Sequence, residues 1–582
     1  SKTACGTYTG TDLTITTAGT ITCSTSGQNL IIDLTGEVLI QGYLRATSIA
    51  ANIEVTAATD VTVSSSGRGI YCEGAACTVV VTAGGDFSLV SSAWIRALGY
   101  LGEVQITAAG DLSLASTTYV LGGYIRASAA SMSMASGTSL NTDYRGYVED
   151  TGAGKPGGTT YLHTGGTYYQ QSVSGGGAGY GGDGGTSCQT HGYASLPSGG
   201  ASYGSSTWPV DYGSGGGFVY YYKATRTGYG GAGGGRVHLT IEGALVMGGI
   251  ITADGKVGSY YNGYDSWDMS GGGGSGGSIL IEADTMSGAG TLKANGGGWN
   301  TKNAGSGSGG RIAVHLDQEP ASTASMPTLT ATVQAFGGNT GSCGGGAAGT
   351  IFYRHGVWTA LRIDNNNNAA ADATRTALPL ELTVATSGSA AAYEGSVVWT
   401  AIAQRSKVEM RGAAGSGTPF NSFYLSLDTT SLVTGPKVEI HTHAATLTGD
   451  ITGTTYIKLH SSEGAWPASK VADVEDSAES ILITDSACYL LSSGGSIEID
   501  FDGEADLSGD SNSATLSIQT GEELVVKTNA HLKATGSSLV AKSLRATVDV
   551  LGYMQATAAS ASISVTAATD VTVSSSGRGI YC

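Results

Sequence analysis

The chain has 582 residues, of which 93 are glycine and only 13% are charged, and its formal net charge at pH 7 is −18. An acidic chain without basic stripes is poorly suited to nucleic acids, and no apolar run reaches the roughly 20 residues that cross a bilayer. No window has the period of a surface helix, while Thr, Ser, Val, Ile and Tyr dominate the non-glycine residues, so we expect an all-β protein.

An internal repeat organises the sequence. The segment 55–72, VTAATDVTVSSSGRGIYC, returns unchanged as 565–582, an offset of 510 residues. The flanks agree more loosely, since GYLRAT from Gly42 and GYMQAT from Gly552 keep the same offset. Repetition at a fixed offset outranks other signals when a fold is predicted. The pattern predicts a chain slightly longer than one module of a larger array.

A shorter period lies inside the module. Similar segments place Asp60, Asp86 and Asp111 at steps of 26 and 25 residues, each followed by alternating apolar and polar residues. Such alternation is typical of a strand with one buried face. A unit of about 25 residues with two or three strands is one coil of a parallel β-solenoid, stacked on its neighbours at about 4.8 Å. We interpret the three aspartates as a turn ladder that accepts backbone N–H bonds, in preference to a catalytic set.

Five segments follow in chain order. Residues 1–142 are predicted to be coils. Residues 143–235 are a glycine- and tyrosine-rich insertion, which we expect to be ordered because free linkers contain few aromatic residues. Residues 236–359 are glycine-rich coils, 360–433 are weakly patterned, and 434–582 are coils that run into the next repeat. The predicted fold is a right-handed parallel β-helix with long glycine-rich excursions.

The middle of the chain resembles a known kind of repeat. The segments GGSILIEADTMSGAGTLKANGG at 276–297 and GSGSGGRIAVHL at 305–316 are similar to the glycine-rich β-helix repeats of very large secreted surface proteins of bacteria and protists. The resemblance covers residues 233–354. It implies that the glycine runs leave the solenoid as hydrogen-bonded excursions, in which polyproline-II-like strands pack closely because no Cβ intervenes.

Eight cysteines lie at no metal-ligand spacing. A disulfide framework, and hence an oxidising compartment, is the better interpretation. Candidate pairs are Cys5 with Cys23, Cys72 with Cys77, and Cys188 with Cys343; Cys488 is left over, and Cys582 is the copy of Cys72. We therefore expect an extracellular or cell-surface location.

An enzyme is weighed because many parallel β-helices cleave polysaccharides. Asn141-Thr142-Asp143 matches one pectinase-like motif and Arg362-Ile363-Asp364 partly echoes another, but the sequence lacks an Asp-Asp pair and a Gly-His-Gly. Glycoside hydrolysis needs paired carboxylates. We therefore expect no enzyme and no cofactor.

Two metal sites are weighed against plainer interpretations. Asp500, Asp502 and Asp506 could offer oxygens to Ca²⁺, although their spacing is not that of an EF-hand, and a solvated acidic turn is the alternative. The histidines His441, His443 and His460 could approach one another on neighbouring strands, and surface histidines are the alternative.

Aromatic residues gather near the glycine runs. They are Tyr220, Tyr221, Tyr222, Tyr260, Tyr261, Tyr264 and Trp267. They either form a platform for sugars or a protein, or cover the glycine-rich excursion.

The sequence as a whole favours a structural function. We expect tandem modules that form the stiff shaft of an extracellular filament or appendage, with neighbouring copies of the module as partners and glycans as a further candidate. An adhesin stalk is the alternative, and a polysaccharide lyase or hydrolase is a third, weaker hypothesis.

Overall fold

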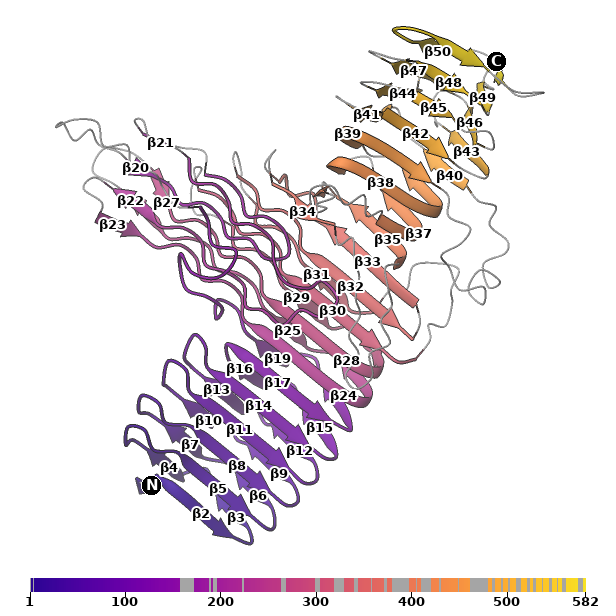
Figure 1. The fold of residues 1–582 in the computed structure, drawn as a ribbon. Helices are drawn as coiled ribbons and strands as arrows, with labels where there is room; N and C mark the ends of the chain where they lie inside the picture. Colours follow the sequence, from indigo (N-terminus) through magenta and orange to yellow (C-terminus); the bar gives the residue numbers. More distant parts are fainter. Residues whose placement is uncertain are drawn as a thin grey trace, which may run out of the picture. The chain divides into compact units, whose positions relative to one another are not determined.

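The computed structural model of the chain (Figure 1) is built of β-strands, and every regular element that it describes is a strand. It divides into two compact units. The first comprises Ser1–Pro320, Thr328–Val357 and Asn368–Thr374, and the second Ala321–Pro327, Trp358–Asn367 and Arg375–Cys582. The structure describes residues 2–3, 5–157, 172–187, 190–191, 196–221, 225–262, 268–298, 304–318, 329–339, 344–356, 358–370, 374–378, 397–404, 406–409, 420–428, 431–447, 450–460, 480–483, 487–492, 496–500, 503–508, 514–520, 524–526, 530–535, 537–543, 547–551, 553–556, 562–573 and 579–581.

Three parallel ladders make up the first unit. The first contains β1 (Lys2–Thr3), β4 (Thr20–Cys23), β7 (Tyr43–Ala46), β10 (Gly69–Cys72), β13 (Trp94–Ala97), β16 (Tyr119–Leu121), β19 (Ser139–Asn141), β25 (Ile250–Thr252), β29 (Thr291–Lys293) and β31 (Thr332–Gln334). The second contains β2 (Gly6–Gly10), β5 (Leu30–Leu34), β8 (Ile53–Ala57), β11 (Thr78–Ala83), β14 (Glu103–Ala108), β17 (Tyr124–Ala129), β24 (Arg236–Met247), β28 (Ser278–Ser287), β30 (Arg311–Leu316) and β32 (Thr350–His355). The third contains β3 (Leu13–Ile15), β6 (Val38–Ile40), β9 (Val61–Ser64), β12 (Phe87–Val90), β15 (Asp111–Leu114) and β18 (Ser131–Met134), then the ends of β24 and β28.

Period-two alternation places one face of every ladder in the core. In β8 the side chains of Ile53, Val55 and Ala57 are buried, whereas Glu54 is exposed. Because successive strands pair in register, equivalent residues stack into columns. One column of side chains that are at most 1% exposed contains Leu30, Ile53, Val79, Val104, Ile125, Val237, Ile279, Ile312 and Ile351. Each such burial contributes about 1.5–3 kcal/mol.

The connections between strands lengthen along the first unit while the ladders stay in register. Hydrogen-bonded partners in adjacent layers are first 26, 25 and 20 residues apart. Later partners are 111, 41 and 41 residues apart. The added residues form the glycine-rich part of the unit and two small antiparallel sheets. These sheets consist of β20 (Ser172–Val173), β21 (Thr190–His191), β22 (Val219–Tyr221) and β23 (Thr225–Gly228), and of β26 (Tyr260–Asn262) with β27 (Asp268–Ser270).

The glycine runs form a lattice of directly hydrogen-bonded backbones outside the ladders. One path runs from Gly213 N to Gly234 O (2.9 Å) and from Gly234 N to Ser275 O (2.9 Å). The next strand continues it, since Gly276 N donates to Ser308 O at 2.9 Å. A Cβ on Gly276 would lie 2.2 Å from the backbone oxygen of Ala294. The described part of the insertion is therefore packed, and its glycines are needed because the backbones leave no room for a side chain.

The second unit also consists of three parallel ladders. The first contains β33 (Trp358–Asp364), β35 (Val397–Ala403), β37 (Phe420–Leu427), the end of β38 (Leu432–Leu447), β40 (Ser480–Ile483), β43 (Gly503–Ser508), β46 (Ala530–Thr535), β49 (Tyr553–Ala556) and β52 (Gly579–Tyr581). The second contains β34 (Thr376–Ala377), β36 (Lys407–Glu409), the starts of β38 and β39 (Asp450–His460), β41 (Ala487–Ser492), β44 (Ala514–Thr520), β47 (Ser537–Ser543) and β50 (Ile563–Thr566). The third contains the middle of β38, the end of β39, β42 (Ser496–Asp500), β45 (Leu524–Val526), β48 (Val548–Val550) and β51 (Val571–Val573).

The two copies of the repeated segment pair in the same way. Val38 pairs with Val61 in the first unit, and Val548 pairs with Val571 in the second, at the same offset of 510 residues. The weakly patterned segment 360–433 also contains strands, β33 to β37. The sequence pattern is weak there because the strands follow one another at irregular intervals.

Candidate functional site

The three aspartates of the short repeat lie at equivalent turns of successive layers. Asp60 Oδ1 accepts a hydrogen bond from Asp86 N at 2.8 Å, and Asp86 Oδ1 accepts one from Asp111 N at 2.8 Å. Asp111 Oδ1 accepts a bond from Ser131 Oγ at 2.6 Å. Each carboxylate satisfies a backbone or hydroxyl donor of the next layer, so these residues act as a turn ladder.

Two more ladders of this kind were not foreseen from the sequence. Asn29 Oδ1 accepts from Asn52 N at 3.2 Å, and Asn52 Oδ1 accepts from Thr78 N at 2.8 Å. The other ladder joins Asp143, Asp254, Asn295 and Phe336 through bonds of 2.7, 2.6 and 2.8 Å. Asn29 and Asn52 each directly precede an apolar run, and this recurrence could have revealed the first ladder. The 111-residue step between Asp143 and Asp254 conceals the second.

Asp143 and Asp254 are the carboxylates that come nearest to an acid–base pair. Burial raises the pKa of Asp143. Burial, with the negative charge of Asp143, raises the pKa of Asp254 to about 6. However, Asp143 accepts from Asp254 N and from Asn141 Nδ2, and Asp254 accepts from Asn295 N. The Asn141-Thr142-Asp143 motif is thus part of a turn ladder. In it the carboxylates of Asp143 and Asp254 accept the same kind of backbone bond that the side-chain amide oxygen of Asn295 accepts from Phe336 N.

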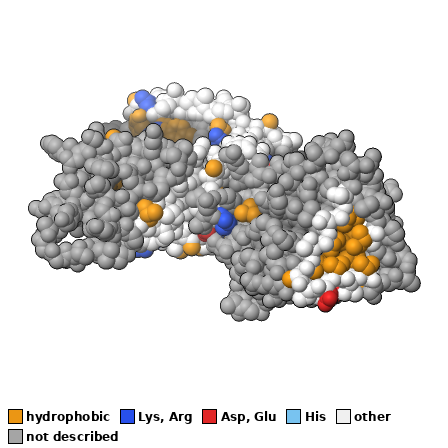
Figure 2. Space-filling model, turned by 90° about the horizontal axis from the view of Figure 1, so that it is seen from above, with side chains coloured by type: hydrophobic (Ala, Val, Ile, Leu, Met, Phe, Trp, Pro, Cys, Tyr) orange, Lys and Arg blue, Asp and Glu red, His pale blue; other side chains and the backbone are white. Residues whose placement is uncertain are grey.

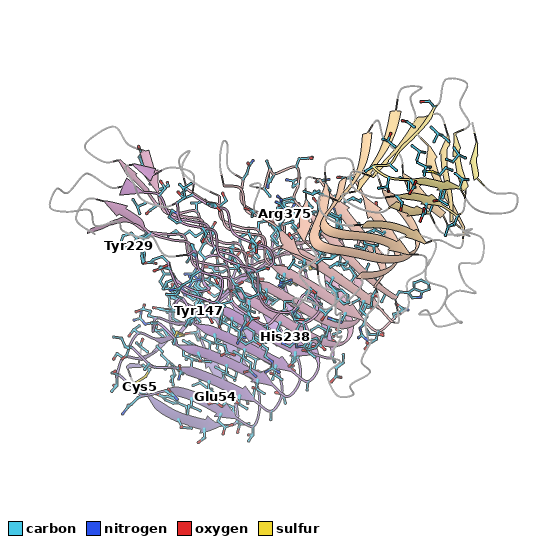
Figure 3. The ribbon with its side chains drawn as sticks, turned by 45° about the horizontal axis from the view of Figure 1, so that its top comes forward. Cys5, Glu54, Tyr147, Tyr229, His238 and Arg375 are labelled. Carbon is cyan, nitrogen blue, oxygen red and sulfur yellow. A yellow bond between two sulfur atoms is a disulfide. The ribbon has the colours of Figure 1, made fainter. Side chains whose placement is uncertain are left out.

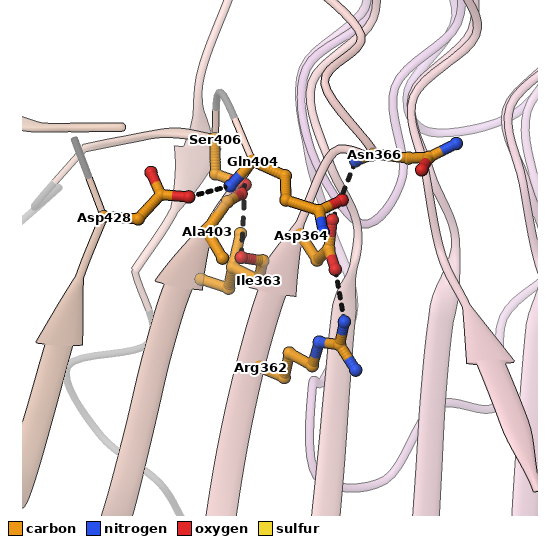
Figure 4. A network of polar contacts seen from close by, with 8 residues as sticks. All are labelled: Arg362, Ile363, Asp364, Asn366, Ala403, Gln404, Ser406 and Asp428. Carbon is orange, nitrogen blue, oxygen red and sulfur yellow. Dashed lines mark hydrogen bonds and ion pairs between the residues drawn. The ribbon is translucent and has the colours of Figure 1, made fainter. Parts of the chain in front are cut away.

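The Arg362-Ile363-Asp364 motif forms a closed network in the second unit (Figure 4). Asp364 is 2% exposed; its carboxylate pairs with Arg362 and accepts a bond from Asn366 N at 2.7 Å. Ser406 Oγ donates to Ile363 O at 3.1 Å, and Asp428 accepts from Gln404 N. These contacts fix the turns that follow β33 and β35. A carboxylate that is buried and already bonded in this way is unsuited to attack a substrate.

The calcium candidates lie on different ladders. Asp500 ends β42 in the third ladder of the second unit, Asp506 lies in β43 in the first, and Asp502 is outside the described residues. His441 on β38 pairs in register with His460 on β39, and His460 pairs with Asp500 on β42. His443 lies two residues beyond His441 on β38. The side chains of these candidates are not among those that the structure describes; among those that it does describe, no group of three His, Cys, Asp or Glu residues could hold a metal ion.

Four of the candidate cysteines form disulfides. Cys5 is bonded to Cys23 with an S–S distance of 2.04 Å, and Cys72 is bonded to Cys77 with one of 2.02 Å (Figure 3, where Cys5 is labelled). Cys188, Cys343 and Cys582 lie outside the described residues, and Cys488 lies in β41. Both disulfides stabilise turns of the first ladder.

The tyrosines of the proposed platform lie on the small antiparallel sheets. Tyr220 and Tyr221 belong to β22, and Tyr260 and Tyr261 belong to β26. Tyr260 is 41% exposed. Tyr222, Tyr264 and Trp267 lie outside the described residues.

A buried polar cluster joins the glycine lattice to the second ladder. Tyr180 is fully buried and its hydroxyl lies 2.5 Å from Ser278 Oγ in β28, while its ring lies 4.7 Å from that of Tyr203. Arg311 in β30 donates from Nε to Tyr203 O at 2.9 Å. Burial raises the pKa of Tyr180 to about 12 and also raises the pKa of Tyr203. The cluster holds neutral hydroxyls in fixed positions and serves as an anchor.

His315 forms a second anchor beside it. Its Nε2 lies 2.7 Å from Thr207 O, and its ring lies 5.4 Å from that of Trp208. Burial lowers the pKa of His315 to about 4, so the imidazole is neutral at pH 7. Glu282 of β28, the register partner of His315, pairs with His238 of β24 at 2.9 Å.

The edge of the second copy exposes side chains that are buried in the first. Val61 and Val63 are 0% exposed, whereas their copies Val571 and Val573 are 45% and 49% exposed. The difference arises because β12 lies on β9, while β51 pairs with β48 alone among the described strands. Hydrophobic side chains gather on the face seen from above Figure 1, the end at which β50 lies (Figure 2).

Comparisons with known proteins give no relative to reason from: no family model, curated protein or solved structure matches the chain. Within the described residues, no helix has the length and hydrophobicity to cross a membrane. The function is therefore inferred from the ladders, edges and surfaces described above.

Proposed function

We propose that the chain is a structural repeat module of an extracellular filament or cell-surface appendage, in which tandem modules form a stiff right-handed parallel β-helix. The observation that carries the proposal is the conserved register of the two copies. Val38 pairs with Val61 as Val548 pairs with Val571, and Leu44 pairs with Ile70 as Met554 pairs with Ile580, with an offset of 510 residues on both sides. A fold that returns to its own starting geometry after one module can be continued by another module.

The pairing within the first copy shows how a following copy would continue the ladders. In the first copy β12 covers β9 by placing Phe87 on Val61 and Leu89 on Val63. A following segment with the sequence of β11 to β13 has the residues to cover Val571 and Val573 in the same register. Removing about half of each valine from water favours this stacking by a fraction of the 1.5–3 kcal/mol that full burial provides.

An extracellular location is supported by composition and disulfides. Stable disulfides persist in oxidising compartments, and both described bridges lie at turns of the first unit. Few charged residues and abundant Ser and Thr suit a secreted surface.

The carboxylates favour a structural function over catalysis. The conspicuous ones are occupied by turn ladders or by the Arg362–Asp364 network. An adhesin stalk remains the alternative, supported by the exposed Tyr260 of β26, and a polysaccharide lyase or hydrolase is the weaker hypothesis.

A chain extension tests the continuation directly. Residues 73–142 are appended after Cys582, so that copies of Cys77 and of β11 to β13 follow β52. We expect the amides of β50, β51 and β52 to exchange with deuterium at least about tenfold slower in the extended chain, because about 1.4 kcal/mol of added stability gives that factor.

The control is the same extension with Phe87→Asp and Leu89→Asp in the appended copy, which cannot cover the valines. Equal exchange in the extended chain, the control and the parent would refute the continuation of the ladders.

A further inference from the structure

The outer face of the first ladder carries a row of aromatic and arginine side chains that no ladder or anchor described above requires. We name it the aromatic–arginine stripe; it consists of Tyr43 and Arg45 on β7, Tyr71 on β10 with the preceding Arg68, Trp94 and Arg96 on β13, and Tyr119 on β16. Parallel register stacks these residues, since Tyr71 lies between Arg45 and Arg96, and Trp94 pairs with Tyr119. Each of the four successive layers therefore contributes one ring to the stripe.

A glycine allows the rings to meet. Gly69 pairs with Trp94, and a Cβ on Gly69 would lie 1.8 Å from Trp94 O. With no side chain at this position, the ring of Tyr43 reaches within 6.1 Å of the Trp94 ring. Tyr71 lies 5.6 Å from Trp94, and Tyr119 is stacked on it at 6.5 Å. Trp94 is 5% exposed, while the three tyrosines around it remain partly accessible.

Two arginines of the stripe lie over these rings, and none of its three arginines forms an ion pair among the described residues. The guanidinium of Arg96 lies 4.0 Å from the Trp94 ring and 4.6 Å from the Tyr119 ring, and that of Arg68 lies 5.7 Å from the Tyr43 ring. Arg45 donates from Nε to Thr22 Oγ1 at 2.7 Å. Among the described residues, the ion pairs involve His238, Arg354 and Arg362, not the arginines of the stripe.

The stripe also contains a hydrogen-bond donor without a partner. Arg96 Nε is buried and has no hydrogen-bond partner. In a chain with a net charge of −18, three neighbouring arginines that form no ion pair among the described residues stand out as a local group of positive charges. Guanidinium groups recognise planar or tetrahedral anions through paired N–H donors.

We propose that the aromatic–arginine stripe binds an acidic polysaccharide. The partly accessible tyrosine rings offer apolar surfaces to the C–H faces of sugar rings, and the guanidiniums bind carboxylate or sulfate groups on the same chain. A row of neighbouring rings, one from each of four successive layers, suits a linear polymer. Single-stranded nucleic acid would be favoured by a longer basic groove, which this acidic chain lacks. This binding site does not depend on the proposed filament function.

The second copy provides a natural variant of the stripe. Tyr553 and Tyr581 occupy the positions of Tyr43 and Tyr71, and Gln555 occupies that of Arg45. Gln555 pairs with Tyr581 in β49 and β52 as Arg45 pairs with Tyr71. The substitution Arg45→Gln is therefore compatible with the ladder; it removes the charge and the bonds that Arg45 donates to Thr22 Oγ1 and to the Tyr71 hydroxyl.

The test measures binding of the full chain to alginate, to dextran sulfate and to neutral dextran by affinity gel electrophoresis at low salt. Binding to the two acidic polymers, weakened by added salt and absent for dextran, is expected. The double variant Arg45→Gln, Arg68→Gln should lose affinity at least about tenfold, since two charge-assisted contacts are removed. Tyr119→Leu should lose about threefold to tenfold, since one stacking partner is removed.

The matched control removes two exposed cations outside the stripe, through Arg126→Gln and Lys256→Gln. It should change affinity less than twofold, and all variants should keep the thermal unfolding temperature of the parent. An equal loss in the control, equal binding of neutral dextran, or no binding of either acidic polymer would overturn the proposal. Tighter binding of a single-stranded DNA would assign the stripe to nucleic acids instead, and self-association lost only in the double variant would assign it to a second copy of the chain; either result also overturns it.

Discussion

The substitution Gly276→Ala tests whether the glycine runs are a close-packed lattice. The added Cβ would lie 2.2 Å from Ala294 O, 2.6 Å from Gly310 N and 2.7 Å from Ala294 C. All three are backbone atoms, so no flexible side chain can move aside. They are also held in place, because Gly310 N donates to Ala294 O at 2.7 Å.

The cost follows from two contributions. Overpacking of a well-packed interior costs about 1–3 kcal/mol, and a buried backbone bond broken by the displacement costs about 1–3 kcal/mol more. Alanine restricts the unfolded chain and returns about 0.4–1 kcal/mol. We expect the free energy of unfolding of the first unit to fall by about 3–4 kcal/mol in denaturant titrations.

Gly10→Ala is the matched control. A Cβ there would meet only the side chain of Leu34, at an ordinary 3.7 Å, so the control should change stability by less than about 1 kcal/mol. Hydrogen exchange of residues 271–277 and 305–310 should accelerate in Gly276→Ala alone. Equal, small effects of the two substitutions would show that the glycine runs are not packed as described.

Three further predictions concern the ladders, the buried titratable groups and a disulfide. Asp86→Ala removes the acceptor of Asp111 N and should cost about 1 kcal/mol in denaturant titrations, whereas Asp86→Asn should cost less because it keeps an oxygen at that point. The stability that neutral His315 provides is complete above pH 6.5 and is lost as the pH falls through about 4; that of Asp254 is complete below pH 3.8 and is lost as the pH rises through about 6. Each change is worth about 3 kcal/mol. Between pH 7 and 4, acidification should therefore raise the stability of the His315→Gln variant relative to the parent protein and lower that of the Asp254→Asn variant relative to the parent. Stability curves of both variants that run parallel to the curve of the parent would contradict these pKa shifts. Replacing both Cys72 and Cys77 by Ser should cost about 2 kcal/mol or more, since a short loop is released and two buried side chains change, and a variant as stable as the oxidised parent protein would contradict this prediction.

Sequence reasoning identified the features that depend on local periodicity. Alternation around Val55 and Val81 predicts strands, and both residues lie in the buried columns of β8 and β11. The equal steps between Asp60, Asp86 and Asp111 predict a ladder because each step is one layer.

Features that depend on long steps could not be read in this way. Asp254 follows Asp143 in its ladder after 111 residues, and no period links them in the sequence. The strands β33 to β37 carry apolar residues, but their spacing is irregular, so the segment 360–433 has no visible pattern. The aromatic–arginine stripe was missed because Gly69 interrupts the series of rings, and only the register shows that Tyr43 reaches Trp94 past it.

Images of the native material test the central claim most directly. If about 14 to 20 layers per module stack at about 4.8 Å, filaments should show an axial repeat of about 65 to 100 Å for each 510-residue module. Filaments with that repeat in negative-stain or cryo-electron micrographs are the predicted result. Compact particles, or filaments with a repeat far outside that range, would contradict a shaft built from tandem β-helix modules.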